Sequence, residues 1–167
     1  MPSRPIAESD FPAVLQLNAE SVRFLSPLDG GGLERLHRQS PLHRVLESEG
    51  RVLAFLIALQ QGAEYGSPNY RWFAERYDRF LYVDRVVVSA AFQGRGAGAR
   101  LYRELFEHAA RQDFPIVCCE FDLAPPNPGS AAFHRRFGFA EVGRQTVGTG
   151  AKLVSLQIAL PPFAHGG

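Results

Sequence analysis

A glycine-rich run near the middle of the chain has the composition of an anion-binding turn: Gln93, Gly94, Arg95, Gly96, Ala97 and Gly98. It follows a β-branched run and precedes a segment with the apolar spacing of an amphipathic helix. At such a strand-to-helix turn, unpaired backbone N–H groups and the helix dipole together favour a phosphate. Glycines cost conformational entropy but let these amides approach a ligand closely. The run therefore predicts a phosphate-binding turn.

The same turn also matches a dinucleotide-binding fingerprint. Gly94, Gly96 and Ala99 fit G-x-G-x-x-A, and Glu120 follows ~20 residues later, where that fingerprint places an acidic residue. The fingerprint normally opens a parallel sheet with two similar halves, whereas here fewer than half of the residues remain and the strand-helix alternation does not repeat. A nicotinamide-dependent enzyme is therefore the less favoured interpretation.

Composition excludes several other kinds of chemistry. The net charge of the 167 residues is only +1, so no uniform field directs the chain toward nucleic acid or a membrane surface, and a small partner is expected. Lys152 is the only lysine. A P-loop with the G-x-x-x-x-G-K-[ST] pattern has no lysine to use, and a Schiff-base enzyme would depend on Lys152 alone.

The two cysteines, Cys118 and Cys119, are adjacent within an apolar run. They are too close for an ordinary structural disulfide and too few for a zinc site, so we expect reduced, buried thiols and no metal. The first residues lack the apolar run of a signal peptide, and no stretch reaches the ~18 apolar residues of a membrane span. These features lead to the expectation of a cytoplasmic protein.

The pattern of apolar residues predicts alternating strands and helices in one domain, residues 1–167. Helical spacing predicts helices near residues 9–22, 33–38, 70–77, 96–111 and 128–137. Strand patterns predict a hairpin at 43–60 and further strands at 81–89, 116–123, 140–147 and 152–160. The glycine-rich turn thus lies between a buried strand and the longest helix.

Two motifs of the chain resemble motifs of the GNAT superfamily of N-acetyltransferases and occur in the same order as in that superfamily. The run Val86, Val87 and Val88, followed by Gln93, Gly96 and Gly98, resembles that superfamily's pyrophosphate motif after a β-branched strand. Downstream, the second match comprises Asn127, Ser130, His134, Gly138 and Phe139 at family-like spacing. Together the motifs span the middle third of the chain, and the order of the flanking elements also suits the family.

The resemblance implies an α/β (α+β) fold with a mixed, mostly antiparallel sheet of about seven strands, splayed between strands 4 and 5 and flanked by about four helices. It also implies acetyl-CoA as cosubstrate. The residues at positions 93–98 would hold the pyrophosphate, and the main chain of Val86, Val87 and Val88 would hold the pantetheine arm. Asn127 corresponds to an asparagine that contacts the coenzyme, although capping a turn is the alternative role.

The resemblance also suggests groups for proton transfer. An acceptor ammonium has no lone pair, so a base must remove its proton, and the departing thiolate needs an acid. His134 occupies the position where the family most often has tyrosine, beside the coenzyme, and is the candidate acid. Asp122 precedes Asn127 by the spacing at which the branch that acetylates ribosomal proteins places a glutamate. Glu120 lies on the same strand face by the period of two, and Asp84 ranks third.

These observations favour a cytoplasmic N-acetyltransferase that moves an acetyl group from acetyl-CoA to a primary amine by direct attack in a ternary complex. The acceptor would be a small molecule or a peptide terminus. A non-catalytic acyl-CoA-binding sensor is the alternative, since a histidine replaces the usual tyrosine. Family analogy also suggests a homodimer through the apolar C-terminal run 152–163, with no nucleic acid or membrane as partner.

Overall fold

The computed structural model describes residues 1–21 and 27–164. These residues form two compact units, each assembled from two segments of the chain. The first unit comprises residues 1–59 and 83–105, and the second comprises 60–82 and 106–167. The prediction of one domain over residues 1–167 stays a prediction.

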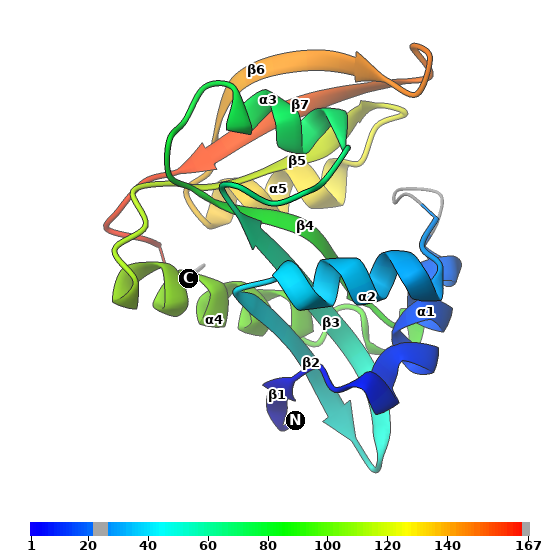
Figure 1. Cartoon of the computed structure of the whole chain (residues 1–167). Helices are drawn as coiled ribbons and strands as arrows, with labels where there is room; N and C mark the ends of the chain where they lie inside the picture. The colour runs from blue at the N-terminus through cyan, green and yellow to red at the C-terminus, as the bar shows by residue number, and fades with distance from the viewer. Residues whose placement is uncertain (22–26, 165–167) are drawn as a thin grey trace. The chain divides into compact units, whose positions relative to one another are not determined.

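The first unit is built on antiparallel strands: β1 (Ser3–Pro5), β2 (Leu42–Ser48) and β3 (Arg51–Gln60). The predicted hairpin is β2–β3, and its second arm is buried from Leu53 to Leu59, as expected for a continuous apolar run. Two helices, α1 (Phe11–Glu20) and α2 (Gly30–Gln39), pack against each other (Figure 1).

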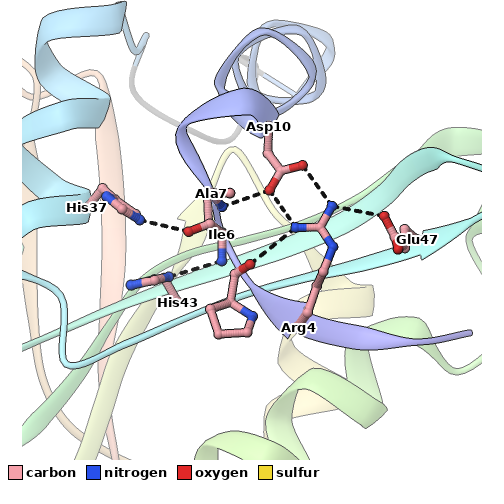
Figure 2. A network of polar contacts seen from close by, with 8 residues as sticks. Arg4, Ile6, Ala7, Asp10, His37, His43 and Glu47 are labelled. Atoms are coloured by element: carbon pink, nitrogen blue, oxygen red, sulfur yellow. Dashed lines mark hydrogen bonds and ion pairs between the residues drawn. The ribbon is translucent and has the colours of Figure 1, made fainter.

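A polar network ties the N-terminal strand to the elements around it (Figure 2). The Arg4 guanidinium donates to Asp10 at 2.7 and 2.9 Å and to Glu47 at 2.9 Å. Asp10 also accepts from the Ala7 N–H at 2.8 Å. Asp10 is the N-cap residue of α1, but its side chain makes no capping hydrogen bond to that helix because these contacts use its carboxylate. They also hold the pKa of Asp10 below its usual value.

The second helix begins earlier than its sequence predicts. Gly30, Gly31 and Gly32 form the first turn of α2, because the Asp29 carboxylate caps it by accepting from the Gly32 N–H at 2.7 Å. Leu33 and Leu36 are the buried residues on the inner face of this helix. Val22, which the sequence assigns to the first helix, lies outside the described residues.

The second unit carries the antiparallel strands β5 (Val117–Ala124), β7 (Lys152–Ala159) and β6 (Ala140–Val147), with β7 in the middle. Two helices, α3 (Pro68–Ala74) and α5 (Pro128–Arg136), pack on opposite faces of β5 (Figure 1). Cys118 and Cys119 are buried thiols within β5 and are not joined in a disulfide, as the sequence predicts, and burial raises the pKa of the Cys118 thiol.

Two elements run through both units: β4 (Leu81–Val88) and α4 (Ala97–Arg111). The strands are hydrogen-bonded in the order β1-β2-β3-β4-β5-β7-β6. The parallel ladder of β4 and β5 pairs Leu81 with Val117 and Tyr82 with Cys118, so the rest of β4 lies outside this register. The predicted mixed, mostly antiparallel seven-stranded sheet is confirmed, with five α-helices in the described part of the chain.

Within residues 1–21 and 27–164, no helix is both long enough and apolar enough to cross a membrane.

Candidate functional site

The glycine-rich run forms an exposed turn at the start of α4. Gly94 and Gly96 have φ values of 77° and 79°, in the left-handed region that glycine adopts without a steric penalty. A Cβ at either position would meet no atom within 4 Å, so backbone conformation rather than crowding requires glycine here. The Gly96 carbonyl accepts from the Arg100 N–H at 3.0 Å, which closes the first helical turn. The N–H groups that follow therefore lie at a helix N-terminus, where an anion is favoured.

The two arginines near this turn differ in their surroundings. The Arg95 side chain is exposed, and its guanidinium lies 5.0 Å from the centre of the Phe92 ring. Arg100 instead donates to the Met1 carbonyl and lies 3.7 Å from the Glu104 carboxylate. Arg95 is therefore the guanidinium better placed to reach a phosphate.

The valines before the turn alternate between the two faces of β4. Val87 is buried, while Val86 and Val88 are half-buried on the other face. Gln93 donates a long hydrogen bond of 3.5 Å to the Val88 carbonyl, linking the turn to the strand end. The contact of the valine main chain with the pantetheine arm stays a prediction.

Asp84 lies on the same strand but is already committed to a buried ion pair. Its carboxylate lies 2.6 Å from Arg85 Nε, and both side chains are 3% exposed. Arg85 also donates to Asn18 of α1 at 2.8 Å. The Asp84 carboxylate is therefore engaged by the neighbouring guanidinium, and its role as a base stays a prediction.

Asn127 is the N-cap of α5. Its Oδ1 accepts from the Ser130 N–H at 3.3 Å. The capping role and a coenzyme contact are compatible, because the cap uses Oδ1 and leaves the contact with a phosphate or amide to Nδ2.

His134 is buried rather than on the helix surface, with 6% of its area exposed. Its ring stacks on Phe121 and meets Phe139 edge-on, at centroid distances of 5.5 and 5.2 Å. Nδ1 lies 2.6 Å from the Ser130 carbonyl oxygen, so Nδ1 carries the proton of the neutral ring. Burial lowers the pKa of His134 below its ordinary value of 6.5, although the Ser130 contact opposes this shift. The imidazole is therefore mostly neutral near pH 7.

Glu120 accepts a short hydrogen bond from a buried phenol. The Tyr82 hydroxyl lies 2.6 Å from Oε1 and 3.1 Å from Oε2, and Tyr82 is 1% exposed. Tyr70 and Phe73 of α3 pack their rings against Tyr82. The Glu120 carboxylate is thus held on the face of β5 that α3 covers.

Asp122 lies two residues further along β5 on the same face. Its side chain is 9% exposed, and Lys152 Nζ lies 3.5 Å from Oδ2. Burial raises the pKa of Asp122 above its ordinary value of 3.8, and the Lys152 charge opposes the rise. A buried carboxyl with a raised pKa is the kind of group that proteins use as a general base.

The candidate catalytic side chains therefore lie on opposite sides of β5. Glu120 and Asp122 point to the α3 face of β5, whereas His134 lies against Phe121 on the α5 face. Acyl transfer needs a base at the acceptor amine and an acid at the leaving sulfur, so separate groups suit two separate tasks.

Sequence reasoning missed the partners of these groups. Tyr82, Ser130 and Lys152 contact Glu120, His134 and Asp122, respectively. Only Ser130 could have been found by spacing, since it lies one helical turn before His134. The other two contacts depend on which strands are neighbours.

Among the described residues, no group of three or more His, Cys, Asp or Glu side chains could hold a metal ion.

Comparison with known proteins shows the class of this chain. The model of the Acetyltransferase (GNAT) family matches residues 10–139, and the chain belongs to this family. A phosphinothricin N-acetyltransferase from Streptomyces coelicolor is 41% identical over 58 residues, which are 35% of this chain and 33% of that relative. The match thus spans only about a third of the curated relative.

Solved structures show the same fold. A ribosomal-protein-alanine N-acetyltransferase from Brucella melitensis has a TM-score of 0.72 at 22% identity, covering 96% of this chain and 99% of that one. A Salmonella typhimurium protein solved with its cofactor acetyl-CoA has a TM-score of 0.72 at 18% identity, covering 96% and 93%. At these identities the likeness shows the fold, which confirms the predicted GNAT-like architecture.

Proposed function

We propose that this protein transfers an acetyl group from acetyl-CoA to a primary amine of a small molecule or a peptide terminus. The observation that carries the proposal is the turn at Gly94 and Gly96, whose left-handed backbone ends at the N-terminus of α4. Such a turn presents N–H groups and a helix dipole to an anion. The pyrophosphate of coenzyme A is the anion that the family membership supports.

The coenzyme contacts are proposed from the two family motifs in the sequence. Backbone N–H groups of residues 94–98 bind the pyrophosphate, and the exposed Arg95 adds a positive charge. Gln93 holds the turn against the end of β4. The main chain of Val86, Val87 and Val88 binds the pantetheine arm, and Asn127 Nδ2 adds a contact beside the cap of α5.

Asp122 is the favoured general base. Its buried carboxyl has a raised pKa and therefore a higher affinity for the proton of an acceptor ammonium. The neutral amine then attacks the thioester carbonyl, for which the Val88 N–H is the proposed oxyanion donor. Glu120 is the alternative base, and its carboxylate accepts a hydrogen bond from the Tyr82 hydroxyl.

His134 is the proposed acid for the departing thiolate. Because Nδ1–H is fixed on Ser130, a second proton has to enter at Nε2, and that nitrogen then donates it to sulfur. The lowered pKa makes this proton easy to give but scarce at neutral pH.

We further propose a cytoplasmic homodimer. The sequence assigned the contact to residues 152–163, but β7 pairs with β5 and β6 on its two sides. The strand edge of this unit belongs to β6, and Val142 on that strand is 37% exposed. The dimer contact is therefore proposed at β6 rather than β7.

Turnover tests the proposed reaction. The purified chain is incubated with acetyl-CoA and a panel of amines and peptides with free N-termini. Release of the coenzyme thiol is followed together with the product mass. The expected result is thiol release that depends on the acceptor, with one acetyl group added to it. Coenzyme binding without thiol release for any amine or peptide would support the non-catalytic sensor instead.

A further inference from the structure

The only lysine of the chain lies beside the proposed base. Lys152 begins β7, and the register of this strand pairs Val154 with Asp122. Residues two apart on a strand share a face, so Lys152 projects on the same side of the sheet as Asp122. Its Nζ lies 3.5 Å from Asp122 Oδ2, while 30% of the lysine side chain is exposed.

The contact is an ion pair at the limit of hydrogen-bonding distance. Among the described residues, Asp122 Oδ2 is the buried side-chain oxygen that has no hydrogen-bond partner. Burial favours the protonated carboxyl, and Lys152 opposes that shift. The Asp122 carboxylate thus relies on one nearby positive charge to stay ionised.

Other charged groups around Asp122 have different partners. On β5, Glu120 is bonded to Tyr82. On β6, the residue in register with Val154 is the uncharged Gln145. Glu141 accepts from Arg144 and from Ser155, and Ser155 pairs with Phe121, whose side chain lies on the opposite face from Asp122. His134, on the opposite face, is held by Ser130 and has a pKa that favours the neutral ring. Lys152 is therefore the cation whose removal changes the charge balance at Asp122.

We propose that Lys152 is a positioning residue that keeps Asp122 ionised, and thereby sets the lowest pH at which the enzyme accepts a proton from its substrate. The proposal rests on the proposed function, in which Asp122 is the general base. An opposite charge at 4–6 Å or closer lowers a carboxyl pKa by about 1–3 units. Loss of Lys152 therefore raises the pH at which Asp122 becomes a competent base by about 1 unit.

A purely structural role for Lys152 makes a different prediction. If the ion pair only fixed the start of β7, its loss would lower activity equally at every pH. A tuning role leaves the activity at high pH intact and moves only the acid limb of the profile. The shape of the pH profile therefore separates the two roles.

The experiment compares kcat/KM against pH for the wild type, Lys152→Met, Lys152→Gln and Lys152→Arg. Arg144→Met is the matched control, since it removes an exposed cation from the Glu141 pair on β6. We expect both neutral variants to shift the acid limb of the profile to higher pH by about 1 unit. On the acid limb, kcat/KM is then ~10-fold lower than in the wild type, and at higher pH the two values are equal. Lys152→Arg keeps the positive charge and is expected to keep the wild-type acid limb. Arg144→Met removes a charge elsewhere and is also expected to leave the acid limb unchanged.

An unshifted limb in both neutral variants, or a loss equal at all pH values, would overturn the proposal. Asp122→Asn separates this failure from failure of the proposed function. If Asp122→Asn is inactive while Lys152→Met is unshifted, only the tuning role is wrong. If Asp122→Asn keeps full kcat/KM, Asp122 is not the base and both proposals fail.

Discussion

At His134, burial and one backbone contact set the pKa of the imidazole, and therefore the pH range in which it can donate a proton. The folded pKa lies below 6.5, so the imidazolium is lost as pH rises through that lowered value. With acceptor deprotonation accounted for, we expect kcat to fall over this range, at lower pH than a free histidine would give.

Substitution of His134 tests the role directly. We expect His134→Gln to lower kcat by ~10²-fold with little change in coenzyme affinity. His134→Tyr is expected to restore activity and to move the falling limb toward a phenol pKa near ~10. An undiminished kcat with an unchanged profile in His134→Gln would leave solvent as the proton donor.

At Asp122, the same burial that suits a base costs stability. Because the folded pKa is raised, the folded chain holds a proton that the unfolded chain has already released, and stability falls as pH rises from 3.8 through the folded pKa. The loss is complete once the pH is above the folded pKa. We therefore expect Asp122→Asn to raise Tm by about 2–4 °C at pH 7, the shift that ~1 kcal/mol produces in a chain of this size. The gain should vanish near pH 3, and calorimetry that shows no gain at pH 7 would argue against the buried charge.

The residues of the candidate site could be proposed from the sequence only where the signal is local. The glycines at positions 94 and 96 are recognisable in the sequence, since alternate glycines before a helix cost conformational entropy unless the backbone conformation requires them. His134 and Asn127 follow from motif spacing. Tyr82 and Lys152 did not, because their contacts with Glu120 and Asp122 join strands whose order in the sheet is set by the whole fold.

Among the elements, α3 and β6 approach each other closely at a glycine. A Cβ on Gly143 would lie 3.1 Å from Cη2 of Trp72 and overlap its Cζ2. We expect Gly143→Ala to lower the free energy of unfolding by about 1–3 kcal/mol, and Trp72→Leu in the same chain to recover much of it.

Urea unfolding checks this contact. Gly66→Ala is the control, because a Cβ there meets no atom within 4 Å. If Gly143→Ala were no less stable than Gly66→Ala, the packing of α3 on β6 would be wrong.

The elements themselves were largely predictable, with two instructive exceptions. Long periodic segments such as α4 and β3 carry their own signal, and the structure places them within a residue or two of the expected bounds. β1 has three residues and ends in proline, so no period could show it. The start of α2 was missed because the Asp29 cap and the burial of Leu33 and Leu36 overcome the low helix propensity of three glycines.

At the scale of the whole molecule, the proposed dimer depends on the exposed edge at β6. We expect light scattering at ~50 μM, well above typical homodimer dissociation constants, to give twice the monomer mass. Val142→Lys, on that edge, is expected to shift the equilibrium toward monomer, since edge lysines oppose strand pairing. A monomer at this concentration would contradict the dimer.

We propose that acetyl-CoA binds with its pyrophosphate at the turn before α4, and calorimetric titration with coenzyme A tests this binding site most directly. Gly96→Asp puts a carboxylate where the anion binds, and Gly50→Asp is the matched control. Both glycines have a left-handed φ, 79° and 72°, with open space around the missing Cβ, but Gly50 lies in the turn of the β2–β3 hairpin. We expect that Gly96→Asp folds and loses at least ~10-fold in affinity for coenzyme A, about 1.4 kcal/mol, while Gly50→Asp binds it like the wild type. Wild-type affinity in a folded Gly96→Asp protein would contradict it.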